Sequence, residues 1–337
     1  MKKGKVDLYT YSMVRKVTTD ESGKANGVSF VSKVDRKEYK LKSRVVVLGA
    51  SACESARILM NSKSKAHPDG IGADSGVLGR YLHDSTGADR MGILPDLIDR
   101  DRYNEDGVGG MHMYTPWWKD NKKLDFARGY HIEYWGGMGQ PAYGAGGGMD
   151  SLRKYLKDEF GNPSPNGGYG AGLKKDIRRI YGSTLGMSGR GESIPQHSNY
   201  CEIDPNMVDT YGIPVLRFHY KWTDQEIKQA KHMQDTFEEI LTQAGATLLG
   251  SKPGPESMYG LAGPGRIIHE VGTTRMSNDP KSGVVSSNCQ VHACKNLFVV
   301  DAGPFVSQAD KNPTWTILAL SWRTSDYIIE QLKQKNI

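Results

Sequence analysis

Apolar and polar residues alternate near the start of the chain and predict extended structure there. Three strands are expected, over 6–17, 27–34 and 39–48, with polar turns between them. The third run ends in four consecutive apolar residues, 45–48, a pattern typical of a strand buried on both faces. Small residues follow at 49–51, and residues 52–60 have the pattern of a helix. Strand, tight turn and helix in this order are typical of the ligand-facing edge of a doubly wound sheet.

A second patterned region lies between residues 194 and 245. It is strand-like up to residue 220, with turns expected at 205–206 and 211–212. A helix is predicted next, because Thr223 and Glu226 have the spacing of a capping box. Six apolar residues form one face of this helix: Ile227, Ala230, Met233, Phe237, Ile240 and Leu241. Gly245 is expected to end it, since glycine is common just beyond a helix C-terminus.

The C-terminal segment repeats the order of strand, turn and helix. A buried strand is expected over 297–300, a turn over 301–304 and a long helix over 313–333. Asn312 is expected at the N-cap of this helix and Pro313 at its first position, because both residue types are favoured there.

Composition argues against several classes of protein. The net charge is +6, but the basic residues are scattered, which disfavours a nucleic-acid groove. The four cysteines lack C-x-x-C spacing, so no metal site is expected. No run of about 18 apolar residues occurs, and no membrane span is expected in this chain. The first residues lack the apolar part of a secretory signal, and localisation, cytoplasmic or periplasmic, stays open.

The motifs that indicate chemistry lie near the C-terminus, and the chain contains no G-x-G-x-x-G, Walker A loop or G-x-S-x-G elbow. His269 opens the block H-E-V-G-T-T-R-M, N-L-F-V-V-D-A-G follows at 296–303, and N-P-T-W-T begins at Asn312. His269 and Asn312 are 43 residues apart. These blocks resemble the C-terminal signature of the glucose–methanol–choline (GMC) oxidoreductases. In that family a catalytic histidine opens H-x-x-G-T-x-x-M, and a second histidine or an asparagine follows at this separation.

The resemblance extends over most of the chain and is loose only between 100 and 190. Residues 49–59 resemble the family's A-G-A-x-x-(S/T)-x-x-x-L block, with Leu48 in place of the first alanine. Residues 79–84 resemble the start of its flavin lid, and residues 201–222 its substrate domain. The family's G-x-G-x-x-G strand is expected upstream of Met1. The chain is therefore expected to begin inside the flavin domain, as a gene fragment, a mis-started frame or one part of a split enzyme.

The family likeness implies an α/β fold, α+β when the whole chain is considered. A partial doubly wound flavin-binding domain is expected over 1–92 and 255–337, the second part carrying His269 and Asn312. A substrate-binding domain with a mainly antiparallel sheet flanked by helices is expected over 93–254.

The likeness also implies FAD as cofactor and roles for individual residues. His269 is expected to take the hydroxyl proton of an alcohol while hydride passes to flavin N5, a contribution of roughly 10²–10⁴-fold for a general base. Asn312 is expected to orient the substrate oxygen. The helix beginning at Pro313 is expected to direct backbone N–H groups, such as that of Thr314, at the reduced flavin. Further cofactor contacts are implied at four residues: Val14, Ala50, Asp301 and Ala302.

The Asn-Pro-Thr motif at 312–314 looks most like that of the sugar-oxidising branch of the family, which includes glucoside 3-dehydrogenases and gluconate dehydrogenases. The expected substrate is a sugar, glucoside or polyol; the electron acceptor, including a small partner subunit or cytochrome, is not indicated by any residue. Two alternatives stay open: an FAD-containing lyase on the same fold, and a non-catalytic remnant unable to bind FAD alone.

Several residues have both a functional and a structural interpretation. Three histidines are expected to be structural: His83, His131 and His197. Two aromatic pairs, Trp117/Trp118 and Tyr134/Trp135, could stack on a sugar or belong to the core. The glycine-rich stretches 136–148 and 161–172 could form a lid or ordinary surface loops.

Overall fold

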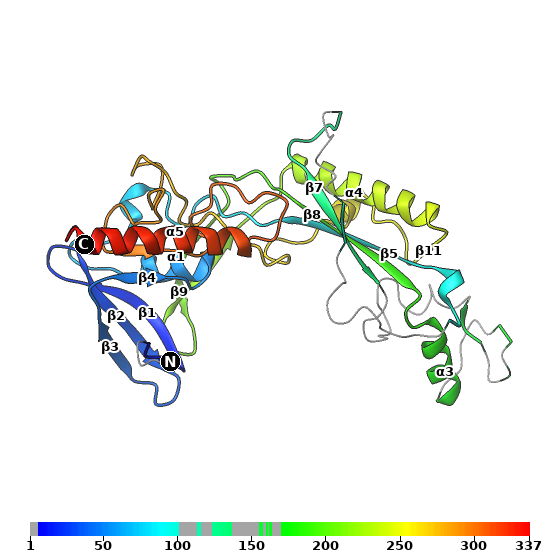
Figure 1. Ribbon diagram of the computed structural model, residues 1–337, viewed down its shortest axis with the longest axis horizontal. Helices are drawn as coiled ribbons and strands as arrows, with labels where there is room; N and C mark the ends of the chain where they lie inside the picture. The colour runs from blue at the N-terminus through cyan, green and yellow to red at the C-terminus, as the bar shows by residue number, and fades with distance from the viewer. Residues whose placement is uncertain are drawn as a thin grey trace.

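The computed structural model describes residues 6–100, 113–115, 123–136, 155–157, 160, 162–163 and 170–337. Trp117, Trp118 and most of the two glycine-rich stretches lie outside the described residues, so those predictions stay untested. The described elements form two bodies side by side, joined by loops, as Figure 1 shows. Helices and mostly antiparallel sheets are mixed in the chain, as the sequence predicts.

The first body contains both ends of the chain (Figure 1). Strands β1 (Ser12–Thr19), β2 (Ala25–Ser32) and β3 (Glu38–Lys42) form an antiparallel sheet. The predicted strand over 39–48 is wrong as a single element. It divides into β3 and β4 (Val46–Leu48), because β4 leaves the antiparallel sheet and pairs in parallel with β12 (Leu297–Val299). Its middle residue, Val47, is 48% exposed, so the expectation of burial on both faces is also wrong.

Two helices accompany this parallel pair. Helix α1 (Ala52–Asn61) follows β4 as predicted, and α5 (Thr314–Lys333) follows β12 in the chain. A core cluster that includes Val17, Leu59 and Leu297 packs the antiparallel sheet, α1 and β12 together. The parallel strands therefore end at neighbouring turns, 49–51 and 300–303, on the edge where ligands bind in open α/β sheets.

Strands β9 (Tyr200–Val208) and β10 (Pro214–His219) form a hairpin that contacts α1. The predicted turn at 211–212 is confirmed by the hydrogen bond from Gly212 N–H to the Asp209 carbonyl. The turn predicted at 205–206 is wrong, since Pro205 and Asn206 lie within β9. A register shift in that part of the hairpin accommodates the proline, which cannot donate to a strand partner.

The second body is built on a five-stranded antiparallel sheet in the order β11-β5-β8-β7-β6. Its strands span Thr247–Leu248 (β11), Thr86–Ile93 (β5), Thr184–Gly191 (β8), Tyr130–Gly136 (β7) and Met113–Thr115 (β6). Helix α4 (Asp224–Gln243) covers one face, and α3 (Ala171–Ile180) lies at one end (Figure 1). The predicted capping box of Thr223 and Glu226 is confirmed, and Gly245 follows α4 with φ 75°, as a terminating glycine does. Short 3₁₀ turns span Ala73–Ser75, Pro95–Leu97 and Pro255–Gly260.

The two faces of this sheet differ in chemistry because side chains alternate along each strand. On β7, Tyr130 and Ile132 pack with Phe237 of α4 in one core cluster. The residues between and beside them, His131 and Glu133, belong to the opposite face and are buried polar groups. Around these two residues, the face away from α4 therefore carries polar and charged side chains.

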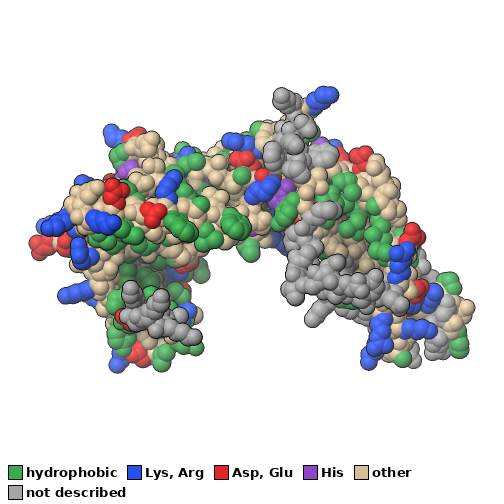
Figure 2. Space-filling model, viewed as in Figure 1, with side chains coloured by type: hydrophobic (Ala, Val, Ile, Leu, Met, Phe, Trp, Pro, Cys, Tyr) green, Lys and Arg blue, Asp and Glu red, His purple; other side chains and the backbone are tan. Residues whose placement is uncertain are grey.

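Helix α5 leaves an apolar face uncovered by the described residues. Trp315 is 83% exposed, and Leu318, Trp322 and Ile329 are exposed at helical spacing after it. Hydrophobic side chains gather over the body that contains α5 in Figure 2. Among the described residues, no helix is both long enough and apolar enough to cross a membrane.

Candidate active site

The structure brings the two residues predicted to be catalytic together. His269 and Asn312 lie on separate loops, yet His269 Nε2 is 3.5 Å from Asn312 Nδ2. His269 is half-buried and Asn312 is exposed, so the pair remains reachable from solvent. An amide N–H directed at Nε2 requires this ring nitrogen to be an acceptor, which is the form in which it can take a proton.

A buried serine contacts the other ring nitrogen of His269. Ser85 Oγ is 3.3 Å from His269 Nδ1 and accepts a hydrogen bond from Gln308 Nε2 at 3.0 Å. Because Nε2 is the acceptor, the imidazole proton sits on Nδ1 and is donated to Ser85. Gln308, Ser85, His269 and Asn312 thus form one polar chain that sets the tautomer of the histidine.

A buried carboxyl group fixes the backbone of His269. Asp84 Oδ1 accepts the backbone N–H groups of His269 at 3.0 Å and of Ser85 at 2.8 Å. Its other oxygen is buried without a hydrogen-bond partner among the described residues. Burial raises the pKa of Asp84 to about 6.

The ionisation of His269 is set by its surroundings. Burial lowers the pKa of His269 below its ordinary value, and the nearby Arg190 guanidinium lowers it further. The Glu133 carboxylate opposes this shift, while His131 adds to it. All three of these neighbours belong to the sheet of the second body. The lowered pKa keeps His269 neutral near pH 7, as a base must be.

The N-terminus of α5 lies next to this pair. The predicted capping arrangement is wrong by one residue: Pro313 is the N-cap, α5 begins at Thr314, and the side chain of Asn312 contacts His269 instead of capping the helix. The first N–H groups of α5, from Thr314 to Thr316, have no acceptor within the described ranges. Such groups stabilise negative charge, so the residues present fit the electron-rich edge of a reduced flavin ring.

The other predicted cofactor contacts lie in the first body. Val14 is on β1 and packs against its core, and the N–H of Ala50 donates to Ser55 Oγ at 3.2 Å. Asp301 is buried, and its carboxylate accepts from Ser55 Oγ and from the Gly303 N–H at 2.8 Å. Ala302 is buried beside Val271. Ala50, Asp301 and Ala302 thus lie at the carboxyl ends of the parallel pair, and their contacts with a cofactor remain a prediction.

The residues expected to be structural have mixed outcomes. His83 is buried, its Nδ1 lies 2.7 Å from the Tyr81 carbonyl, and burial lowers its pKa to about 4. Tyr134 packs against the core under α4, and Trp135 packs with a neighbouring apolar cluster. His197 is exposed and lies edge-on to Tyr81. His131, in contrast, contacts Asp310, two residues before Asn312.

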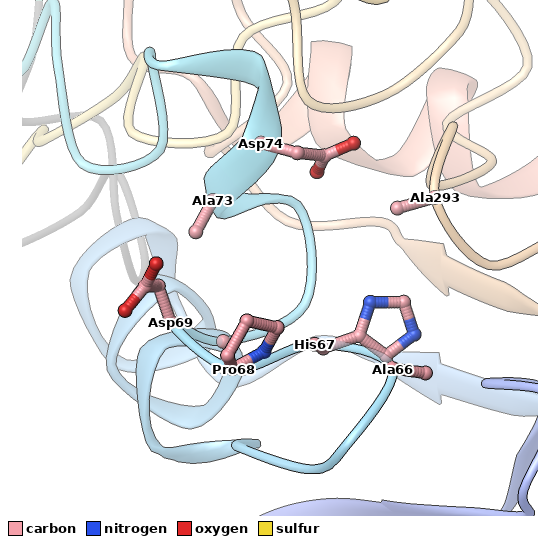
Figure 3. Close-up of a pocket in the computed structure, with 8 residues that line it drawn as sticks. Ala66, His67, Pro68, Asp69, Ala73, Asp74 and Ala293 are labelled. Atoms are coloured by element: carbon pink, nitrogen blue, oxygen red, sulfur yellow. The ribbon is translucent and has the colours of Figure 1, made fainter.

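Sequence reasoning missed Asp84, Ser85 and Gln308. The motif at 79–84 ends at the first of them, but only the fold shows that this segment meets His269. A shallow cavity of about 300 Å³ in the first body, lined by residues such as His67, Asp69 and Ala293, shares no residue with this site (Figure 3). Within the described residues, no cluster of His, Cys, Asp or Glu side chains could hold a metal ion.

A histidine and an amide side chain thus meet beside the N-terminus of a helix, near the carboxyl ends of two parallel strands, which is the edge where ligands bind in open α/β sheets. Residues 195–321, which include both His269 and Asn312, match the family described as GMC oxidoreductase. The family likeness predicted from the sequence is supported by this match, which shows that residues 195–321 are similar to GMC oxidoreductase C-terminal domains.

The chain is similar to enzymes of several substrate classes. It is 27% identical over 324 residues to a 2-methyl-1,2-propanediol dehydrogenase of Mycolicibacterium austroafricanum, covering 96% of this chain and 54% of that protein. It is 25% identical over 337 residues to a C-glycoside 3-oxidase of Arthrobacter globiformis, covering 97% of this chain and 54% of that enzyme. The chain thus spans about half the length of the curated relatives it matches.

A solved structure supports the fold class. A formate oxidase of Aspergillus oryzae, studied for its FAD modification, superposes with a TM-score of 0.64 at 14% identity, covering 96% of this chain and 60% of that one. The predicted mixed α/β fold is confirmed. The domain boundaries at 92 and 254 stay predictions.

Proposed function

We propose that this chain is the His269-bearing part of an FAD-dependent oxidoreductase that oxidises a CH–OH group of a sugar, glucoside or polyol. The observation that carries the proposal is the placement of a neutral, Nε2-accepting histidine 3.5 Å from an amide donor at the start of α5. Both groups converge where a substrate hydroxyl can sit between them and the free N–H groups of the helix.

The proposed chemistry assigns each group one task. Bound FAD supplies the acceptor for the hydride that leaves the substrate carbon. His269 Nε2 takes the hydroxyl proton, since the Nδ1 position is already protonated and donates to Ser85. Asn312 Nδ2 donates to the substrate oxygen and orients it without competing for the proton. Thr314 and its neighbours present backbone N–H groups to the negative charge that develops on the cofactor side, worth up to ~2 kcal/mol when partly buried.

Two observations support a polyhydroxylated substrate. Glu133 and Arg190 lie on the face of the sheet away from α4, close enough to His269 to influence its pKa. Arg190 Nε is 3.7 Å from Glu133 Oε2. Charged donors and acceptors of this kind suit hydroxyl-rich ligands. Among the relatives, one acts on a propanediol and one is a C-glycoside oxidase by name.

The exposed apolar face of α5 offers a surface for packing another segment beside the proposed FAD site. We propose that Trp315, Leu318 and Trp322, with Val47 of β4, pack against a flavin-domain segment of the kind that makes the relatives longer. Among the residues that the structure describes, the parallel sheet has two strands, and parallel sheets usually occur as larger buried sheets. The electron acceptor, including a small partner subunit or cytochrome, remains undefined by these residues.

The test compares His269→Ala with wild type in FAD-loaded protein. We expect the variant to retain FAD but to lose bleaching of the flavin by sugars and polyols under anaerobic conditions, by about 10²–10⁴-fold. His197→Ala, which changes an exposed histidine, is the matched control and should bleach like wild type.

Each other result has a definite meaning. Bleaching of the variant within about tenfold of wild type would remove His269 as the base. Bound FAD that no alcohol bleaches, in wild type, would favour a lyase. Failure to bind FAD when all flavin-domain segments are supplied would favour a non-catalytic remnant.

A further inference from the structure

The loop that carries Asn312, residues 304–313, contains neither helix nor strand and so depends on side-chain contacts for its shape. Ala309 has φ 66°, a left-handed conformation that costs a non-glycine residue about 1 kcal/mol or more and persists only when its neighbours hold it. The residues on both sides of Ala309 are held. Gln308 is buried against Ser85, and Asp310 contacts a histidine from the sheet of the second body.

That histidine is His131 on β7, which is fully buried. Its two ring nitrogens each face a carboxylate: Nε2 lies 3.3 Å from Glu133 Oε1, and Nδ1 lies 3.4 Å from Asp310 Oδ2. The Nδ1 contact with Asp310 is at ion-pair distance without hydrogen-bond geometry. A charged imidazolium between two carboxylates is attracted to both, so the arrangement favours the doubly protonated form. We refer to Glu133, His131 and Asp310 as the carboxylate clamp.

Other titratable groups lie around the clamp, and one of them, Glu192, is close enough for Asp310 to raise its pKa. Arg190 of β8 faces Glu133 at 3.7 Å, Lys311 contacts Asp310, and the ring of Tyr114 from β6 lies 4.9 Å from the His131 ring. His269 lies near enough for His131 to influence its ionisation. The clamp and His269 therefore belong to one polar region.

We propose that His131 is a positioning residue, whose imidazolium holds Asp310 and thereby keeps Asn312 against His269. This inference rests on the proposed function for its catalytic consequence, although the clamp itself is a property of this chain. Asp310 is two residues from Asn312, so a displacement of the loop at Asp310 moves the amide that faces His269. Misplacement of a substrate-orienting group by about 1 Å can cost about 100-fold in rate.

The clamp predicts an upper pH limit for the enzyme. Burial opposes the charged form of His131, but the carboxylates of Asp310 and Glu133 outweigh it and raise its pKa above the ordinary value. The pKa of Asp310 is lowered, since His131 and Lys311 outweigh the effect of burial. As pH rises through the folded pKa of His131, its positive charge is lost and its attraction for the Asp310 carboxylate weakens.

The test uses two clamp variants, Asp310→Asn and His131→Gln, with His232→Gln as a matched control. His232 belongs to α4 on the other face of the sheet, and its Nδ1 lies 2.9 Å from the hydroxyl of Tyr130 on β7. In ¹⁵N-detected NMR we expect both nitrogens of His131 to be protonated at neutral pH, and Asp310→Asn to lower the pKa of His131. Amide hydrogen exchange over 306–312 should accelerate about tenfold or more in the clamp variants only.

The catalytic arm uses FAD-loaded protein and anaerobic reduction by a sugar that bleaches wild type. We expect Asp310→Asn to reduce flavin about 10- to 100-fold more slowly, with unchanged FAD binding and an upper pH limit shifted to lower pH. A neutral His131 at neutral pH, or an Asp310→Asn enzyme within twofold of wild type, would overturn the clamp. Absence of bleaching in wild type would instead overturn the proposed function, and the NMR and exchange results would still decide the clamp.

Discussion

Asp84 offers the sharpest thermodynamic test of how this site is built. It is 1% exposed, its Oδ1 accepts two backbone N–H groups, and its Oδ2 is buried without a hydrogen-bond partner among the described residues. Burial is the largest cause that raises its pKa to about 6, and the Glu270 carboxylate adds to the shift. At neutral pH the protein therefore bears the free-energy cost of a buried charge in order to anchor His269.

The perturbation is Asp84→Asn, which keeps an oxygen acceptor for the two N–H groups and removes the charge. The folded pKa of Asp84, about 6, lies above the ordinary value of 3.8. The stability that the carboxyl contributes is thus fully present below its unfolded pKa and is lost as pH rises through about 6. A pKa raised by this much corresponds to roughly 3 kcal/mol, as an upper bound. The amide N–H that the substitution introduces has no acceptor, which costs about 1–3 kcal/mol, but equally at every pH, so it cancels from the difference.

The assay is urea unfolding of wild type and variant at about pH 4 and about pH 7.5, on either side of the titration. We expect the free energy of unfolding of the variant, relative to wild type, to rise by up to about 3 kcal/mol between the two conditions. Asp326→Asn, which removes an exposed carboxylate on α5, controls for the loss of one charge. A difference between variant and wild type that is the same at both pH values would refute the buried-charge argument.

Two further outcomes are expected from the contacts around His269. Ser85→Ala removes the acceptor for the Nδ1 proton of His269. Flavin reduction in FAD-loaded protein should slow about tenfold with little change in KM. An unchanged rate would show that other contacts set the tautomer of His269. Gly272→Ala places a Cβ 2.4 Å from the Tyr81 carbonyl oxygen at φ 94°, so the free energy of unfolding should fall by about 1–3 kcal/mol; a variant as stable as wild type in urea would contradict the strain.

Local patterns were sufficient where the determining contacts are near in sequence. The capping box of Thr223 and Glu226 and the helix after β4 follow from residues within one or two turns. The pairing of His269 with Asn312 was predicted from motif spacing, through the family likeness. The structure confirms that these two residues meet.

Apart from the turn expected at 205–206, the failures involve contacts between distant segments. The apolar run at 45–48 did not indicate that β4 would pair in parallel with residues 297–299 and would not continue the antiparallel sheet of β1–β3. Asn312 was expected at the N-cap from its residue type, but its side chain contacts His269, 43 residues away, and Pro313 is the N-cap. Ser85 is separated from His269 by 184 residues and from Gln308 by 223, distances at which no periodicity carries information.

The positions of the two histidines explain why one fold can place opposite charge states side by side. His269 has mainly burial and the Arg190 guanidinium around it, and its pKa is lowered; His131 is buried too, yet two carboxylates reverse the effect and raise its pKa. In the proposed mechanism the base has to be neutral and the clamp has to be charged, so both conditions hold only between the two pKa values. The antiparallel register of β7 and β8 places Glu133 and Arg190 in contact. These two charges therefore help to make the pKa values of the two histidines differ. In the proposed mechanism, the sheet of the second body therefore tunes the ionisation of a base that belongs to a loop outside it.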